Sequence, residues 1–117
     1  MAEPTNSKQF KTREEILGMN DLPLEELFIP EWDTYVYVRG LSGRERVEFE
    51  QSQFTVKGTV IKLTLSNILS LLAYLGTCNK DGSRFFTRKD IEALGGRNAS
   101  ALDRIAGRIQ VLSRLTR

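Results

Sequence analysis

Side chains able to do chemistry are few in this sequence and are not grouped. The chain has no histidine and one cysteine, Cys78, so the commonest general base and metal ligand is absent. Catalysis by a nucleophile needs a neighbouring base, and only carboxylates, lysines, tyrosines and Cys78 remain. A positive neighbour such as Lys80 would make Cys78 a reactive thiol, but a lone cysteine after a leucine-rich segment is more often a packing residue. We therefore expect no catalytic residue, no cofactor and no enzymatic activity.

The turn Asn79-Lys80-Asp81-Gly82 invites comparison with a calcium-binding loop. If Gly82 took the sixth position of such a loop, Thr77 and Arg88 would fill the first and twelfth positions. Calcium needs carboxylate oxygens at both. The Gly95-Gly96 pair also lacks the spacing and the Lys-Ser/Thr ending of a phosphate-binding loop. Neither a metal site nor a nucleotide site is expected.

The charges are nearly balanced in number but unevenly placed. Seventeen Lys and Arg residues face fifteen Asp and Glu residues in 117 residues, for a net charge of +2. The acidic residues concentrate in the first half and include Glu14, Glu15, Asp21, Glu25, Glu26, Glu31, Asp33, Glu45, Glu48 and Glu50. The basic residues of the last third are Arg84, Arg88, Lys89, Arg97, Arg104, Arg108, Arg114 and Arg117. Such asymmetry suits electrostatic docking with a partner or with another copy of the chain.

The length predicts one domain with one modest core. A single cysteine excludes an internal disulfide and fits a reducing cytoplasm. No apolar run approaches the roughly 20 residues that span a bilayer, and the first residues lack a signal-peptide core, so we expect no membrane association. Residues 1–11 are polar and are expected to form a flexible tail, followed by a single domain over residues 12–117.

The first half of that domain predicts a short helix, a hairpin and a second helix. Thr12 with Glu15 forms a capping box that opens a helix through about Met19. Residues 27–29 and 34–39 are expected to be strands joined at residues 30–33, with Val36 and Val38 on one face and Tyr35 and Tyr37 on the other. Ser42 with Glu45 opens a helix over about residues 44–54. Residues 55–62 fit a loop, a strand or a helix.

The second half predicts a buried helix, a turn and two further helices. Residues 63–75 are apolar nearly all round, which is typical of a central helix. The turn at residues 79–82 joins short extended arms, 76–79 and 84–86. Thr87 with Asp90 resembles a third capping box, and Gly95-Gly96 is expected to end that helix in left-handed backbone angles. Asn98 or Ser100 caps the last helix. The fold class is therefore α+β, with an N-terminal β-hairpin packed on a mostly helical body.

Two groups of residues are candidates for binding a partner. The last helix carries one continuous apolar stripe, and its arginines lie mainly off that stripe. The aromatic residues of the hairpin are the other group, since Trp and Tyr are enriched at binding hot spots. Each of the apolar and aromatic side chains among them also fits an ordinary place in or beside the core. The candidates are Trp32, Tyr35, Tyr37, Leu102, Ile105, Ile109, Leu112, Arg104 and Arg108.

Nucleic-acid binding is the alternative function. Residues 87–112 can be interpreted as a helix-turn-helix pair, with Arg97, Arg104 and Arg108 placed to contact phosphates. Against it, the second helix is apolar to its end, and Asn98, Ser100 and Ala101 offer few long donors for base edges. A small DNA-binding regulator therefore remains the second hypothesis.

Two segments in fixed order resemble the small tail assembly chaperones of long-tailed bacteriophages and prophages. The first pattern, V-x-V-R-x-L-[ST]-G-x-E-R, is matched from Val36 to Arg46. The second, C-x-x-x-D-G-x-R-x-F-[ST]-x-x-D-I-x-x-L, is matched from Asp81 to Leu94, with Cys78 one residue closer to Asp81 than in the pattern, and is followed by a closing helix with Leu112-Ser113. The resemblance spans about residues 12–116. It departs from the pattern at Arg88-Lys89, where acidic residues are common.

The resemblance implies a non-enzymatic role in virion construction. Such chaperones keep the long hydrophobic tape measure protein soluble in the host bacterial cytoplasm. They also recruit the major tail protein so that the tail tube polymerises around the tape measure. They are usually absent from the finished particle, often self-associate, and are often made in two lengths by a translational frameshift. Binding to the tape measure protein, to the major tail protein and to further copies of the chain is therefore expected.

Overall fold

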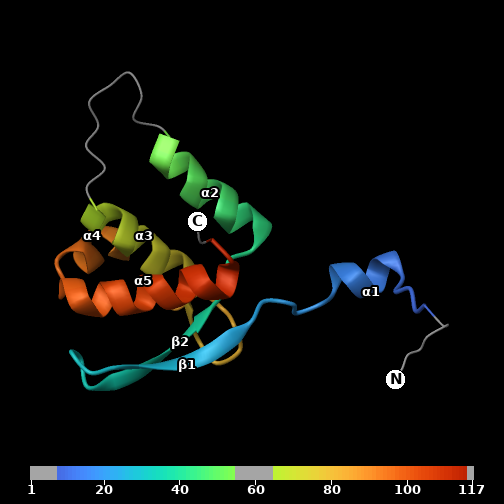
Figure 1. Cartoon of the computed structure of the whole chain (residues 1–117), viewed down its shortest axis with the longest axis horizontal. Coiled ribbons are helices and arrows are strands. Elements are labelled where there is room, and N and C mark those ends of the chain that lie inside the picture. The colour runs from blue at the N-terminus through green and yellow to red at the C-terminus, as the bar shows by residue number, and fades with distance from the viewer. Residues whose placement is uncertain (1–7, 55–64, 116–117) are drawn as a thin grey trace.

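The computed structural model describes residues 8–54 and 65–115 of the chain (Figure 1). The undecided segment 55–62 lies outside the described residues. Of the predicted tail, residues 8–11 are exposed and belong to no helix or strand. The elements, in chain order, are α1 (Arg13–Leu17), β1 (Leu24–Ile29), β2 (Thr34–Arg39), α2 (Gly43–Phe54), α3 (Leu65–Gly76), β3 (Thr77–Cys78), α4 (Asp90–Gly95) and α5 (Ala99–Ser113).

The predicted hairpin is confirmed, and a third strand joins it. β1 starts at Leu24, three residues earlier than expected, and pairs antiparallel with β2 from Leu24↔Arg39 to Ile29↔Thr34. The turn between them contains Asp33 with φ 53°. β3 then pairs antiparallel with β2 through Tyr37↔Cys78, which gives the strand order β1-β2-β3. β3 lies within the predicted extended arm 76–79, but its pairing with β2 was not predicted, because only two residues pair, and they pair with a segment about forty residues away.

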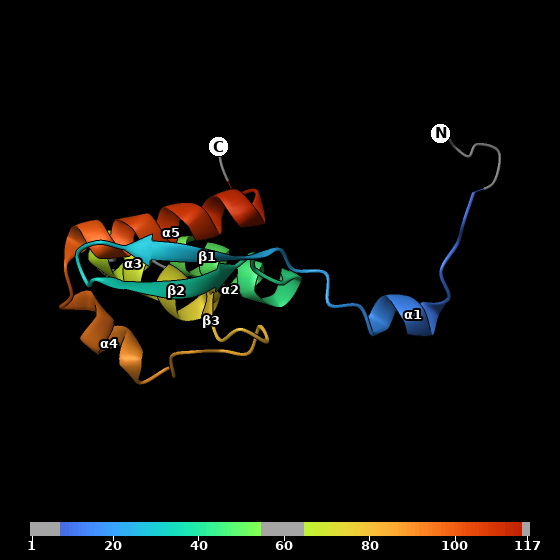
Figure 2. The same ribbon diagram turned by 90° about the horizontal axis from the view of Figure 1, so that it is seen from below.

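The helical body covers one face of the sheet (Figure 2). α3 and α5 pack side by side, α5 contacts β1 and β2, and α4 contacts α3. Alternation along the strands turns one set of side chains inward, and these meet apolar residues of the two long helices. The largest fully buried side chains of this core include Ile29, Val38, Leu72, Leu75, Leu102, Ile105 and Ile109. The α+β fold class is therefore as predicted from the sequence.

Two of the three predicted capping boxes are complete. At α1 the Thr12 hydroxyl accepts from the Glu15 N–H at 3.1 Å and the Glu15 carboxylate accepts from the Thr12 N–H at 2.8 Å. At α2 Ser42 and Glu45 repeat this exchange at 3.2 and 2.9 Å. The third box is only half formed. Asp90 accepts from the Thr87 N–H, but its own N–H donates to the Thr87 carbonyl rather than to the hydroxyl.

The expected glycine geometry after α4 is wrong. α4 ends at Gly95 as predicted, but Gly96 has φ −91°, which is not left-handed. Its N–H donates to the Ala93 carbonyl, so a tightened last turn ends the helix instead of a left-handed residue. The next helix is capped by Asn98, whose side chain accepts from the Ala101 N–H.

α1 stands apart from the body. Figures 1 and 2 both show it at the end of an extended segment that leads away from the sheet. No residue of α1 is buried. The segment meets the body at Pro23, whose carbonyl accepts from the Gly40 N–H at 2.9 Å.

Candidate partner-binding surface

The apolar stripe of the last helix is part of the core. Leu102, Ile105 and Ile109 expose 1%, 0% and 0% of their surface, and Leu112 is half-buried against the same cluster. The ordinary packing role that the sequence allowed for these residues accounts for all four. We therefore assign no partner contact to them.

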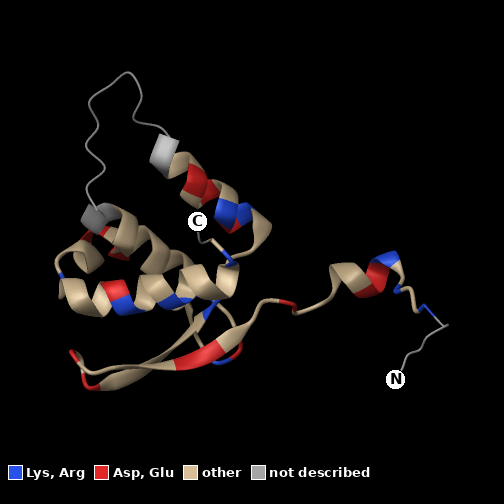
Figure 3. Cartoon of the chain, viewed as in Figure 1, with Lys and Arg blue, Asp and Glu red and all other residues tan. Residues whose placement is uncertain are grey.

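The two candidate arginines of α5 bind carboxylates of the hairpin. Arg108 Nε and Nη2 donate to Glu25 at 2.6 and 2.9 Å. Arg104 Nε donates to Glu31 at 2.8 Å, and this hydrogen bond lowers the pKa of Glu31. Figure 3 shows basic positions of α5 facing acidic positions of β1 and the turn. These ion pairs therefore use some of the unevenly placed charges to join two segments of one molecule. From the sequence, such charges were expected to dock a partner or another copy of the chain.

These pairs count against the DNA-binding alternative. Arg104 and Arg108 were two of the three arginines expected to contact phosphates, and both are held by Glu31 and Glu25. The first helix of the supposed pair, α4, has only six residues. Ala101, near the start of α5 where base edges would be read, is fully buried.

An exposed aromatic face remains on the other side of the hairpin. Phe28 and Tyr35 lie opposite each other in the β1–β2 register, with ring centroids 4.9 Å apart and planes at 54°. Tyr35 exposes 65% of its surface, Phe28 42% and Leu24 39%. With the exposed Glu26 and the half-buried Tyr37, these residues form what we call the outer hairpin face. Of the sequence candidates, it contains Tyr35 and Tyr37.

Trp32 is not part of this face. It is half-buried and packs against the core cluster, which matches the core-edge role that the sequence allowed for it. Phe28 and Leu24 were not among the candidates from the sequence, because Phe28 was placed in the first strand without being assigned to a face and Leu24 was left outside that strand. The alternation Leu24, Glu26, Phe28 was the available signal.

A buried ion cluster fixes the hairpin to the helices. Arg39 donates to both Glu45 oxygens at 2.8 and 2.9 Å, and Arg84 donates to the same carboxylate at 2.7 Å. Burial by itself would raise the pKa of Glu45. The hydrogen bonds from Arg39 and from the Ser42 N–H, with the charges of both arginines, lower that pKa to about 2. The carboxylate therefore holds β2, α2 and the segment after β3 in one arrangement.

Cys78 is placed as a packing residue. It exposes 2% of its surface and lies opposite Tyr37 in the β2–β3 register, and burial raises the pKa of its thiol. Within residues 8–54 and 65–115, no group of three or more acidic or cysteine side chains could hold a metal ion. No helix of the same residues is long and apolar enough to cross a membrane.

Comparison with known proteins gives a match among solved structures. No protein-family model matches the chain, and no curated protein matches its sequence. Among solved structures, the tail assembly chaperone of bacteriophage HK97 is similar with a TM-score of 0.62 and 15% sequence identity. The match covers 85% of this chain and 90% of that one. The chain therefore shares its fold with the HK97 tail assembly chaperone, in agreement with the resemblance carried by its sequence motifs.

Proposed function

We propose that the protein is a bacteriophage tail assembly chaperone that binds and solubilises the tape measure protein and promotes polymerisation of the tail tube. The observation that carries this proposal is the shared fold, which extends over 85% of the chain. The two sequence motifs support it independently, because they are features of the sequence and not of the fold. The protein would act in the host bacterial cytoplasm and would be absent from the mature virion.

The outer hairpin face is the surface that we assign to the client. A chaperone for apolar helices needs exposed apolar side chains that can lie against a helix. Phe28 and Tyr35 offer two such side chains on a sheet that the helical body supports from behind. Aromatic residues give large contact areas with few rotatable bonds, so they are efficient anchors. Glu26 lies between Leu24 and Phe28 and would favour basic residues beside the apolar stripe of the client.

The remaining partners follow from the same role. The major tail protein would be recruited to the complex of chaperone and tape measure protein, and further copies of the chain would join it. Neither a membrane nor nucleic acid is included among the partners. Arg104 and Arg108 are paired with carboxylates of the same chain, which supports excluding nucleic acid from the partners.

Co-expression tests the client interaction. An insoluble tape measure fragment is expected to become soluble when it is expressed with this chain. The double variant F28S/Y35S should lose most of this effect, because it removes both exposed rings without touching the core. Val111→Ser is the matched control, since Val111 exposes 51% of its surface on α5 and lies outside the outer hairpin face.

Two results would contradict the proposal. One is a client fragment that stays insoluble with the wild-type chain, and the other is full solubilisation by F28S/Y35S. Binding to duplex DNA supplies the independent check. The proposal expects no complex, whereas a DNA-binding regulator would bind with an affinity that falls steeply as salt rises.

A further inference from the structure

β1 is the open edge of the sheet. The strand order β1-β2-β3 places β2 on one side of it, and no described residue pairs with its other side. The opposite edge of the sheet is closed, because the segment after β3 folds back on it through the bridge Cys78↔Arg84. An uncovered edge strand offers unpaired N–H and C=O groups to any chain that can pair with it.

The register shows which backbone groups of β1 point outward. The Gly40 N–H donates to the Pro23 carbonyl at 2.9 Å, and these two residues continue the β1–β2 register. In an antiparallel pair, positions that hydrogen-bond to the partner strand alternate with positions whose backbone groups turn the other way. The backbone groups of Leu24, Glu26 and Phe28 therefore point away from β2.

These three outward positions are accessible. All three residues are exposed, and no hydrogen bond from outside the hairpin, within residues 8–54 and 65–115, reaches their backbone groups. Pro30 occupies the next outward position and has no N–H, so the edge ends there. The distance from Leu24 to Phe28 along an extended strand is about 13 Å, which suits a short partner strand.

The carboxylate at the centre of this edge is unpaired. Glu25, on the inner face, binds Arg108, whereas Glu26 forms no ion pair with any other described residue. Side chains opposite each other on neighbouring strands share a face, and opposite charges in such a pair attract. A lysine or arginine therefore fits opposite Glu26, and apolar residues fit opposite Leu24 and Phe28.

We propose that the edge of β1 binds an extended segment of another protein by strand addition. The segment would carry an apolar residue, a lysine or arginine, and a second apolar residue at alternate positions. Backbone hydrogen bonds would supply affinity, and the alternate side chains would supply specificity. A helix cannot use this edge, because its own backbone groups are already paired. The inference therefore concerns a second kind of ligand and does not rest on the proposed function.

Amide hydrogen exchange of the free chain tests the geometry. The N–H groups of Leu24, Glu26 and Phe28 should exchange about tenfold or more faster than those of Glu25 and Leu27, because only the latter two are paired with β2. Nuclear magnetic resonance resolves these amides one by one. The alternation distinguishes an open edge from general fraying of the strand.

A synthetic peptide tests the binding. The probe is a capped heptapeptide in which valine, lysine and valine alternate with threonine, with threonine at both ends. At saturation it should slow the exchange of the three outward amides about tenfold or more and leave the inward amides unchanged. A helix lying on the outer hairpin face would not produce this pattern, because it cannot pair with the outward N–H groups.

Two variants of Glu26 separate backbone pairing from charge. Glu26→Pro removes the outward N–H, which the β1–β2 pairing does not use, and proline is tolerated at such edge positions. It should keep the circular dichroism spectrum of the wild type and weaken peptide binding about tenfold or more. Glu26→Gln keeps the N–H and should weaken binding only about threefold, through loss of the ion pair.

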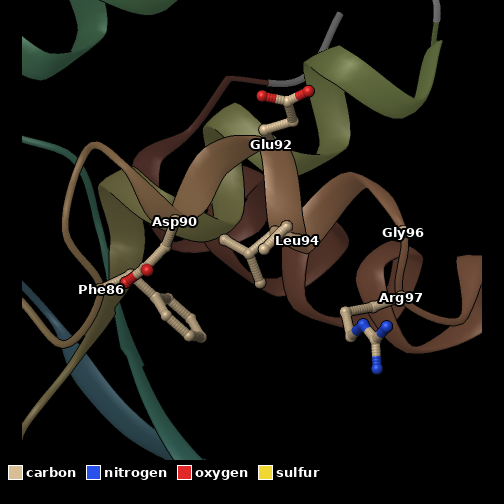
Figure 4. A pocket seen from close by; sticks show the side chains of 7 residues that line it. Phe86, Asp90, Glu92, Leu94, Gly96 and Arg97 are labelled. Carbon is tan, nitrogen blue, oxygen red and sulfur yellow. The ribbon is translucent and has the colours of Figure 1, made fainter.

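Glu92→Gln is the matched control for the charge. Glu92 is exposed on α4 and forms no ion pair with any other described residue. Its side chain lies at a hollow beside α4 and points away from Phe86 and Leu94 (Figure 4). This variant should bind the peptide as the wild type does.

Four results would overturn the inference. They are outward amides that exchange as slowly as inward ones in the free chain, outward amides that millimolar peptide leaves unchanged, and undiminished binding by Glu26→Pro. The fourth is slowing of the outward amides as the chain concentration rises without peptide, which would assign the edge to a second copy. If Glu26→Pro fails to fold, the exchange pattern of the wild type with and without peptide decides alone. No client is present, so failure here is distinguishable from failure of the solubilisation assay.

Discussion

Arg39 and Glu45 form a two-point ion pair that is almost completely buried, with their side chains 8% and 9% exposed. Arg39 ends β2 and Glu45 lies in the first turn of α2. The same carboxylate accepts from the Ser42 N–H and from Arg84. The Glu45 side chain therefore caps a helix and balances the charges of two arginines. It also connects segments that are 39 residues apart.

Removing this carboxylate should be costly, because two arginines would lose their counter-charge. We expect Glu45→Ala to lower the free energy of unfolding by about 3–5 kcal/mol, measured by urea denaturation. Glu45→Gln should cost less, since an amide oxygen can still accept from the Ser42 N–H. Glu50→Gln is the control, because its ion pair with Arg46 is exposed and contributes about 0.5 kcal/mol or less. A Glu45→Ala variant as stable as this control would contradict the assigned role.

The same carboxylate predicts a pH dependence of stability. Its pKa falls from 4.5 to about 2 in the folded protein, so the folded state binds the proton less tightly than the unfolded chain. The contribution is complete above pH 4.5 and is lost as pH falls toward 2; it amounts to about 3 kcal/mol at most. The stability difference between wild type and Glu45→Gln should be constant above pH 5 and shrink below it. A difference that stays constant down to pH 2 would contradict the lowered pKa.

Two glycines of the helical body should respond oppositely to alanine. A Cβ on Gly76 would lie 2.5 Å from Ile109 Cδ1, whereas a Cβ on Gly107 would meet nothing within 4 Å. We expect Gly76→Ala to destabilise the protein by about 1–3 kcal/mol through overpacking. Gly107→Ala, inside α5, should stabilise it by about 0.5–1 kcal/mol. Thermal unfolding of both variants checks the pair, and a neutral Gly76→Ala would show that α3 and α5 do not approach so closely.

Cys78 should react only when the structure opens. The thiol is buried and its pKa is raised, so both access and thiolate formation are suppressed. Modification by a disulfide reagent at pH 8 should be about a thousandfold slower in the native protein than in urea, as expected for a domain of ordinary stability. A native rate near that of the unfolded chain would restore the reactive-thiol hypothesis.

The local features of this fold could be predicted from the sequence because their causes lie within a few residues. Thr12 with Glu15 and Ser42 with Glu45 are complete boxes, and alternation along residues 34–39 correctly separated Tyr35 from Val38.

Features that depend on distant residues were missed. The pairing of Cys78 with Tyr37 and the approach of Arg84 to Glu45 join segments about forty residues apart. The α5 stripe was seen correctly, but only the fold distinguishes a buried stripe from a partner surface. The exposure of Ile16 and Leu17 was also not predicted, because a capping box indicates where a helix begins but not whether the helix packs on the body.

Exchanging the charges of Arg108 and Glu25 tests whether this ion pair serves the fold or the binding of a partner. Arg108→Glu should lower the urea midpoint of unfolding, because two carboxylates would then face each other at a partly exposed contact. The exchange Glu25→Arg/Arg108→Glu should recover most of that loss, and 1 M salt should reduce both effects by screening. If the pair serves the fold alone, the exchanged variant will also solubilise the tape measure fragment as well as the wild type does. Full stability with lost solubilisation would instead assign Glu25 or Arg108 to the client.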